Sequence, residues 1–99
     1  MATMYKLEYI STFHMDIRQV TENLEEYPQK AYRILSKLDK ILNNLPDMPE
    51  LYPICEDFPS FRKITVEDYS AFYTVNKQAG VIEVHRLIYA KMDIPKQLM

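Results

Sequence analysis

The spacing of apolar residues changes twice along this chain, and the two changes limit the folds that it can adopt. From about Met4 to Ile10, apolar and polar residues alternate, which predicts a strand with one buried face. From residue 11 to residue 45, apolar residues recur every three or four positions, which predicts amphipathic helices. After residue 60 the chain is rich in β-branched and aromatic residues, so a second set of strands should follow the helices.

The helical region divides into two helices at Pro28. A proline disfavours the α conformation of the residue before it but is tolerated in the first helical turn, so Tyr27 should end one helix and Pro28 should begin the next. Ser11 or Thr12 is placed to cap the first helix, and Asp16 lies in its early turns, where the helix dipole favours an anion. The apolar stripes contain Phe13, Ile17, Val20, Leu24 and Tyr27 in the first helix, and Ala31, Ile34, Leu35, Leu38, Ile41, Leu42 and Leu45 in the second. Two such helices should form a hairpin that a sheet covers.

The segment from Pro46 to Pro59 separates this hairpin from the later strands. Its four prolines, at positions 46, 49, 53 and 59, prevent regular structure, so it should be an irregular connection. The alternatives are a functional loop and a packed belt, and we expect a belt at the edge of the core through Tyr52, Ile54 and Phe58.

Three β-rich runs complete the chain. They read "FRKITV", "YSAFYTV" and "VIEVHRLIY", and they are joined by Glu67-Asp68 and by "NKQAG", which are both suited to turns. An antiparallel meander is expected. The predicted fold is therefore α+β with the order β-α-α-β-β-β, an antiparallel sheet carrying an N-terminal helical hairpin on one face. Residues 1–99 should form a single domain, since this length supports one modest core.

Composition excludes several functions. No apolar run is long enough to span a bilayer, and Cys55 is the only cysteine, so we expect a chain of the reducing cytoplasm without a membrane partner. One cysteine and two histidines cannot supply a zinc cluster, and Gly80, the only glycine, excludes a glycine-rich phosphate loop. No metal and no cofactor is expected. The net charge of −2 argues against general affinity for nucleic acid, although residues 60–99 carry six basic and four acidic side chains and could hold a local phosphate.

The last strand, "EVHRLIYAKMD", is interrupted by His85 and Arg86. Strict alternation would place Ile82, Val84, Arg86 and Ile88 on one face and Glu83, His85, Leu87 and Tyr89 on the other. Two interpretations stay open. In the first, Arg86 is partly buried and pairs with Glu67, Asp68 or Asp93, while His85 is a neutral, exposed or hydrogen-bonded imidazole. In the second, the sheet face opposite the helices is an open groove that Arg86, Arg62 and Lys91 mark.

The strand, helical hairpin, proline-rich loop and three final strands together resemble the RelE/ParE superfamily of bacterial toxins, also described as plasmid stabilisation proteins. The resemblance covers nearly the whole chain. Its motifs are Arg62-Lys63 entering the second strand, Tyr69 with Tyr73, and the final run Arg86-Leu87-Ile88-Tyr89-Ala90-Lys91-Met92-Asp93. It implies the toxin of a type II toxin-antitoxin pair, with a cognate antitoxin as partner and with the option of a higher-order complex.

The resemblance also suggests site residues. Arg62, Arg86 and Tyr89 match positions of catalytic residues in members that cleave messenger RNA. Such a reaction needs no metal, because a base, fixed cations and an acid are sufficient. The target-binding candidates are Lys63, Tyr69, Tyr73, His85 and Lys91.

Two positions depart from the ribonuclease pattern. Ser70 follows Tyr69 where RelE-like ribonucleases carry an arginine, and Met92 stands where a second basic residue is common. These departures favour the ParE-like branch, so we expect growth inhibition through binding of an essential target such as DNA gyrase. A ribosome-dependent mRNA endonuclease is the alternative, and a degenerate toxin that only binds its antitoxin is the third.

Overall fold

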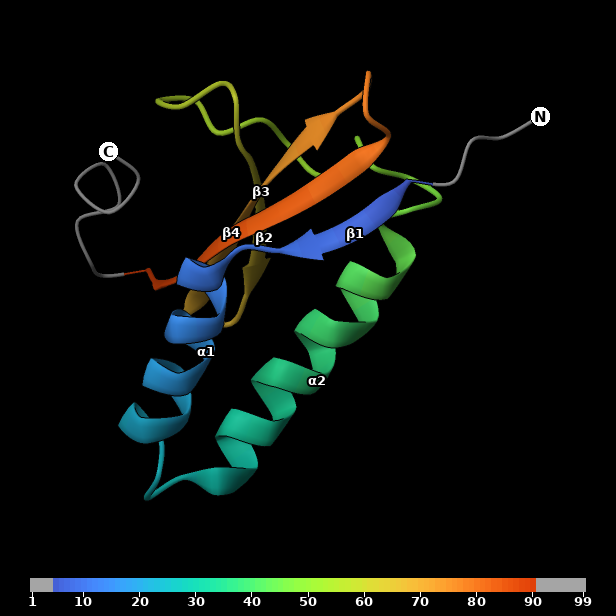
Figure 1. The fold of residues 1–99 in the computed structure, drawn as a ribbon. Coiled ribbons are helices and arrows are strands. Elements are labelled where there is room, and N and C mark those ends of the chain that lie inside the picture. Colours follow the sequence, from blue (N-terminus) through green and yellow to red (C-terminus); the bar gives the residue numbers. More distant parts are fainter. Residues whose placement is uncertain (1–4, 91–99) are drawn as a thin grey trace.

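The computed structural model describes residues 5–90, which form a four-stranded sheet with two helices on one face (Figure 1). The elements are β1 (Lys6–Tyr9), α1 (Ser11–Asn23), α2 (Pro28–Asn44), β2 (Arg62–Val66), β3 (Tyr69–Asn76) and β4 (Val81–Tyr89). The predicted fold class and element order are confirmed. None of the helices in the described part of the chain is long and apolar enough to cross a membrane.

The sheet has the order β1-β4-β3-β2 and is mixed rather than wholly antiparallel. The predicted meander is present, because β3 pairs antiparallel with both β2 and β4. The first strand differs from the expectation: β1 lies at the edge and runs parallel to β4, with Lys6 opposite Val81 and Tyr9 opposite Val84. A strand can pair in either direction without any change in its own alternation, so its residues alone could not predict this.

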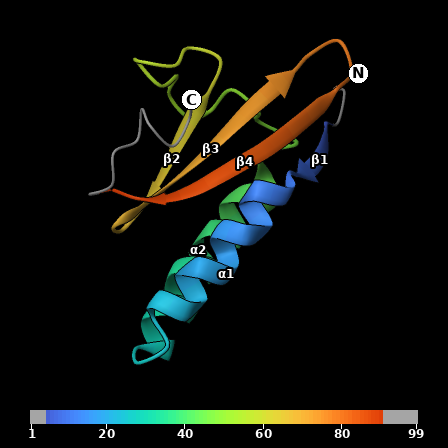
Figure 2. The same cartoon turned by 60° about the vertical axis from the view of Figure 1, so that its left-hand side comes forward.

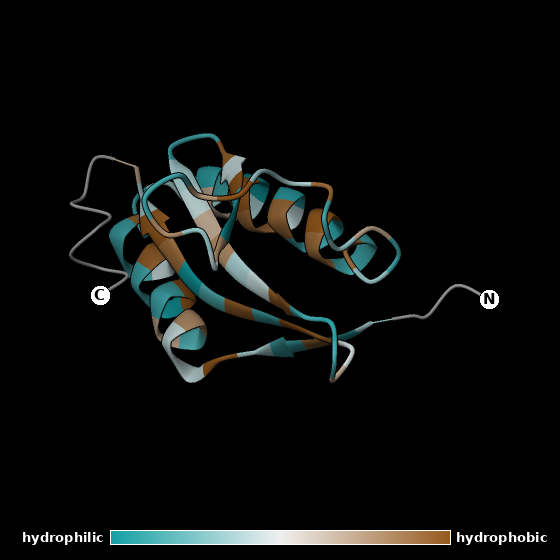
Figure 3. Cartoon of the chain, turned by 90° about the horizontal axis from the view of Figure 1, so that it is seen from above, coloured by the Kyte–Doolittle hydropathy of each residue, from teal (hydrophilic) through white to brown (hydrophobic). Residues whose placement is uncertain are grey.

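The core lies between the sheet and the two helices, which lie below the sheet, with α1 in front of α2 in the view of Figure 2. Apolar stretches run along both helices and the strands that lie over them (Figure 3). The most deeply buried members are Ile34, Leu38, Leu45, Ile64, Tyr73, Ile82 and Val84. Burial of each such side chain stabilises the fold by about 1.5–3 kcal/mol.

The helix ends differ from the prediction in two ways. Ile10 is the N-cap of α1 and makes no side-chain cap hydrogen bond, while Thr12 Oγ1 instead donates to the carbonyl of His85 at 2.7 Å. The predicted cap at Ser11 or Thr12 is therefore wrong. α1 ends at Asn23, four residues before the predicted end at Tyr27. Tyr27 is instead the N-cap of α2, and Pro28 begins α2 as predicted.

The connection between α2 and β2 is held by hydrogen bonds from the sheet. The Tyr73 hydroxyl donates to the carbonyl of Pro49 at 2.8 Å, and the backbone N–H of Lys63 donates to the carbonyl of Pro53 at 3.0 Å. Tyr52 packs against the core, as the belt prediction requires. Ile54 does not, because 52% of it is exposed.

The turn between β2 and β3 anchors α2 to the sheet. Glu67 has a left-handed backbone, with φ of 53°, and its carboxylate accepts from Arg33 at 2.7 and 2.8 Å and lies 3.5 Å from the Lys37 ammonium. The neighbouring Asp68 accepts from Lys30 at 3.1 Å. The Arg33 hydrogen bond, followed by the positive charges of Arg33 and Lys37, lowers the pKa of Glu67 to about 2. This pKa identifies the turn as a charged contact that favours the ionised carboxylate.

Candidate functional site

A β-bulge in β4 is the main irregularity of the sheet. Tyr73 pairs with Val84 while the adjacent Phe72 pairs with Arg86, so His85 is an extra residue in β4. Such a bulge disrupts the alternation of side chains. Val84 and Leu87 both belong to the core under the helices, which strict alternation would forbid.

The bulge corrects the predicted faces of the last strand. Before the bulge, Ile82 and Val84 both face the helices. After it, Leu87 and Tyr89 pack against the helix-side core, and alternation places Arg86 on the opposite face. The expectation that Arg86 shares a face with Val84 is therefore wrong, because one inserted residue shifts the pattern by one position.

The imidazole of His85 lies on the sheet face opposite the helices. Its Nε2 is 2.9 Å from Oγ1 of Thr74, and its ring meets the ring of Phe61 edge to face, with centroids 5.2 Å apart. Burial lowers the pKa of His85 from its ordinary value of 6.5, against a smaller opposing effect of Glu83. A neutral, hydrogen-bonded imidazole was one of the two interpretations of this residue, and the geometry agrees with it.

The guanidinium of Arg86 is held by the carboxylate of Asp16. Arg86 Nε donates to Asp16 Oδ2 at 2.7 Å, and Nη2 donates to Oδ1 at 3.1 Å. The backbone N–H of Leu87 donates to the same Oδ2 at 2.9 Å. The side chains of Arg86 and Asp16 are only 23% and 15% exposed. This is a two-pronged, mostly buried ion pair with an added backbone hydrogen bond, the strong form of such contacts.

Asp16 replaces the acids that the sequence suggested as partners of Arg86. Glu67 and Asp68 pair with α2, so their expected pairing with Arg86 is wrong. Asp93, the third suggestion, lies outside the described residues. Sequence reasoning missed Asp16 as the partner of Arg86 because the two residues are 70 positions apart and no local pattern links them.

Helix α1 reaches the bulge because it takes over the edge of β4 from β1. β1 pairs with β4 only as far as Val84, whose carbonyl accepts from the N–H of Ile10 at 2.9 Å. Beyond that point the Thr12 hydroxyl binds the carbonyl of His85, and the Asp16 carboxylate binds the N–H of Leu87. Side chains four positions apart on one helix thus satisfy backbone groups that a neighbouring strand would otherwise pair.

The structure does not bring Arg62 and Arg86 together on one open face. By alternation Arg62 shares the face of Ile64, which packs under the helices. Its guanidinium donates to the carbonyl of Tyr52 at 2.7 Å and to that of Glu50 at 3.3 Å, and it lies 3.7 Å from the Glu50 carboxylate. Arg62 therefore holds the proline-rich connection in place. Its catalytic role stays an untested prediction.

The remaining predicted residues are divided between the two faces. Lys63 lies in the same row as Arg86, with Phe72 between them, on the face opposite the helices. Tyr73 is completely buried and Tyr69 nearly so, and burial raises the pKa of both phenols. Tyr89 is half-buried, with its ring centroid 5.5 Å from that of Tyr69. Lys91 lies outside the described residues. The roles of these residues in catalysis or target binding also stay predictions.

A cavity of about 370 Å³ borders the ion pair. Asp16, Arg86 and Tyr89 are among the residues that line it, together with Tyr69 and Val20. We call Asp16, His85, Arg86 and Lys63 the bulge site. Within residues 5–90, no group of three or more His, Cys, Asp or Glu side chains is placed to hold a metal ion.

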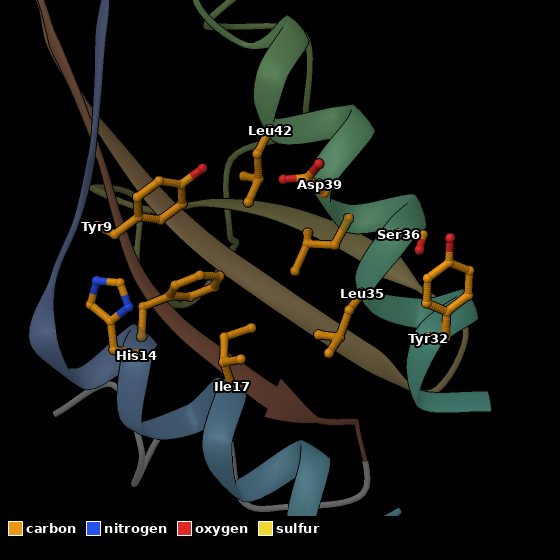
Figure 4. Close-up of a pocket in the computed structure, with 10 residues that line it drawn as sticks. Tyr9, His14, Ile17, Tyr32, Leu35, Ser36, Asp39 and Leu42 are labelled. Atoms are coloured by element: carbon orange, nitrogen blue, oxygen red, sulfur yellow. The ribbon is translucent and has the colours of Figure 1, made fainter. Parts of the chain in front are cut away.

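A second hollow lies between α1, α2 and β1, and we call it the helix groove (Figure 4). It has a volume of about 560 Å³, and its floor is apolar. Its lining residues are Tyr9, Phe13, His14, Ile17, Tyr32, Leu35, Ser36, Leu38, Asp39 and Leu42. The sequence predicted the apolar stripes of both helices, but the groove depends on how far apart the helices lie.

The wall that β1 contributes to this groove is aromatic. The ring of Tyr9 stacks on Phe13 with centroids 5.5 Å apart, and it lies 6.0 Å from the ring of His14. Burial, and secondarily the negative charge of Asp39, raises the pKa of Tyr9. Asp39 is the one carboxylate in the lining, where it accepts a hydrogen bond from Asn43 at 3.3 Å. The groove thus combines an apolar floor with a sparse polar rim.

The sequence matches a family described as the ParE toxin of the type II toxin-antitoxin system, parDE, over residues 8–94. No curated protein matches the chain significantly in sequence. Among solved structures, it is similar to the chromosomal ParDE system of P. aeruginosa, with a TM-score of 0.74, 17% identity, and coverage of 90% of this chain and 99% of the other.

Two other solved structures are similar. A mutant of the E. coli toxin RelE in the free state has a TM-score of 0.69 and 16% identity, with 95% of this chain and 92% of the other covered. The intact E. coli RelBE toxin-antitoxin complex has a TM-score of 0.62 and 20% identity, with coverage of 89% and 99%. At these identities the structural matches establish the fold, and the family match carries the classification.

Proposed function

Because the chain belongs to the ParE toxin family of type II toxin-antitoxin systems, within the RelE/ParE superfamily, we propose that it inhibits growth by binding an essential protein target such as DNA gyrase. The observation that carries this choice is that Arg62 and Arg86 both bind partners within the chain. Metal-independent cleavage of RNA needs cations that stabilise the charge developing on phosphorus. Arg86 binds both oxygens of Asp16, and Arg62 binds backbone carbonyls and Glu50.

Ser70 supports the same choice. Its side chain is buried, at 1% exposure, between Thr65 on β2 and Ile88 on β4. RelE-like ribonucleases resemble this chain but place an arginine at this position. A serine sealed in the sheet cannot contact a phosphate, and this favours action through protein contact.

Induction of the chain in bacteria distinguishes the candidate activities. We expect DNA breakage, with intact transcripts and with translation unaffected at early times. Cut messages with intact DNA would instead support the mRNA endonuclease. Normal growth at a verified expression level would support the antitoxin-binding module alone.

We place the cognate antitoxin in the helix groove. The solved relatives named for ParDE and RelBE are toxin-antitoxin systems or complexes. An apolar hollow of this size is a liability in a free protein and fits the apolar face of an amphipathic helix. The product of the adjacent reading frame should co-purify with the chain. Its binding should slow the hydrogen exchange of the backbone amides around groove residues such as Leu35 and Ile17. Protection confined to the opposite sheet face would contradict this placement.

The mRNA endonuclease remains the second candidate for one specific reason. Lys63, His85 and Arg86 lie on the same sheet face, and a neutral imidazole can accept a proton from a ribose hydroxyl. In this case the partner would be the ribosome with its message. Mapping of transcript ends in cells that express the wild type and His85→Gln tests it, because cleavage should then depend on the imidazole.

A further inference from the structure

Asp16 gives Arg86 a defined position that the strand alone cannot provide. An arginine side chain has many rotamers, and two parallel N–H···O bonds to one carboxylate select among them. The same carboxylate is itself fixed, because Oδ2 also accepts from the backbone N–H of Leu87 at 2.9 Å. The anchor is therefore tied to the backbone beside the residue that it orients.

The bulge makes this anchor necessary. By inserting His85, the bulge moves Arg86 from the face of Val84 to the opposite face, next to the part of the β4 edge that β1 does not cover. Helix α1 lies along that edge through Thr12 and Asp16, which are four residues apart. Its core residues Phe13 and Val20 lie three and four positions from Asp16, so Asp16 borders the buried stripe of α1 on the side of Thr12. Asp16 therefore belongs to the side of α1 that faces the bulge.

We propose that Asp16 is the positioning residue for Arg86, holding its guanidinium at the edge of β4 where a target can contact it. The inference rests on the proposed function, because it takes Arg86 as a residue that the target contacts. It adds that the helical hairpin contributes to the bulge site through a carboxylate. Growth inhibition then requires the charge and the geometry of Asp16 as well as the arginine.

The first test compares Asp16→Asn with Thr12→Val. Asparagine keeps one acceptor oxygen but loses the charge and the second hydrogen bond to Arg86. Thr12→Val removes the other contact between α1 and the β4 edge without touching Arg86, so it is the matched control. We expect Asp16→Asn to lose growth inhibition and Thr12→Val to retain it, with cooperative melting in both.

Spectroscopy separates positioning from general stability. The Nε–Hε signal of Arg86, assigned by its disappearance in Arg86→Lys, should be shifted and slow to exchange in the wild type. In Asp16→Asn it should move toward the position of exposed arginines and exchange faster, while in Thr12→Val it should stay in place. An Arg86 signal that is identical in Asp16→Asn and the wild type would overturn the proposal.

A charge reversal provides a second, independent outcome. Asp16→Arg and Arg86→Asp should each lower the melting temperature, and the double variant should recover part of the loss by forming the opposite ion pair. Growth inhibition should not return, because the cation then lies on α1. Recovery of both melting temperature and growth inhibition would show that the pair only stabilises the fold, and the positioning role would be wrong.

Failure of the inference can be distinguished from failure of the proposed function. If Arg86→Ala abolishes growth inhibition while Asp16→Asn retains it, the target contact stands and the positioning role falls. If both Arg86→Ala and Asp16→Asn retain DNA breakage, Arg86 is not a target contact and the role assigned to Asp16 falls with it. The gyrase proposal itself depends on the breakage assay alone.

Discussion

The bulge site and the helix groove lie on different sides of α1 and differ in the kind of side chain that they contain. At the bulge, charged and polar groups are satisfied within the chain: Arg86 by Asp16, and His85 by Thr74. In the groove, apolar side chains from α1 and α2 line about 560 Å³ of open space. The polar pairs thus tie α1 and β3 to β4, while the apolar groove is the surface where we propose that the antitoxin binds, because apolar burial supplies most of the free energy of association.

Each wall of the groove is anchored by an ion pair outside it. Asp16 ties α1 to β4, and on the other side Arg33 and Lys30 tie α2 to the turn at Glu67 and Asp68. The width of the groove therefore depends on contacts that no groove ligand needs to touch. The following predictions test how independent the two regions are.

Removal of the Arg86 charge should have the largest effect on stability. Arg86→Met keeps most of the side-chain volume but leaves the mostly buried carboxylate of Asp16 without its cation, which should lower the free energy of unfolding by about 2–4 kcal/mol. Urea unfolding measures this. The control is Arg18→Met, at an exposed arginine on α1, the helix that carries Asp16. It should change stability by no more than about 0.5 kcal/mol. Equal stability of the two variants would show that the bulge pair contributes nothing to the fold.

A charge placed in the groove should weaken binding of the partner. Ile17→Asp introduces a carboxylate into the apolar floor and should weaken binding of the adjacent reading frame's product by about 2 kcal/mol or more, roughly thirtyfold. Calorimetric titration gives the affinity. The matched control is Met15→Asp, at a residue that is 67% exposed on α1 and outside the groove lining. If the control weakens binding equally, the partner does not occupy the groove.

The imidazole at the bulge should make stability depend on pH. Its pKa is lowered in the folded state, so below the unfolded value of 6.5 the unfolded chain binds more protons than the folded one. The wild type should therefore lose stability as pH falls through 6.5 toward the lower folded pKa. His85→Gln can still bond Thr74 and should lose less between pH 7.5 and 5.5 in urea unfolding. A parallel decline in both proteins would assign the pH dependence to other groups.

The anchor of the α2 wall should give the smallest effect. The pKa of Glu67 is about 2 in the folded state against an ordinary value of 4.5, so its contribution to stability is present above pH 4.5 and is lost as pH falls toward 2. Glu67→Gln should melt slightly below the wild type at neutral pH, and the two melting temperatures should converge across this window. A gap that persists at pH 2 would assign the difference to the left-handed backbone rather than to the ion pairs.

Much of the fold could be predicted from local patterns. The alternation in Lys6–Tyr9, the apolar stripes of the two helices and the proline at the start of α2 each act over a few residues, and each appears in the structure. The family motifs also led to the right superfamily. The resemblance could not show which arginine would be paired inside the chain.

The candidate site was predicted less well, for two reasons. The residue types of β4 do not indicate the bulge at His85. The faces of Arg86 and Leu87 were therefore predicted from strict alternation, which the bulge interrupts. Arg62 was predicted to be a catalytic cation, a role that stays untested. Its hydrogen bonds to carbonyls of the proline-rich connection could not be predicted, because carbonyl acceptors are present at every residue. Neither feature depends on residue type alone.

What the amino-acid sequence determined by itself is the kind and order of the elements and the buried side of the helices, because periodicity and turn chemistry act between near neighbours. The tertiary structure decided the parallel pairing of β1 with β4, the inserted residue in β4, and the meeting of Asp16 with Arg86. These depend on which distant segments come to share an edge. Backbone groups that no strand pairs at that edge form hydrogen bonds with whichever side chain the packing brings near them. No local sequence pattern predicts which side chain this is.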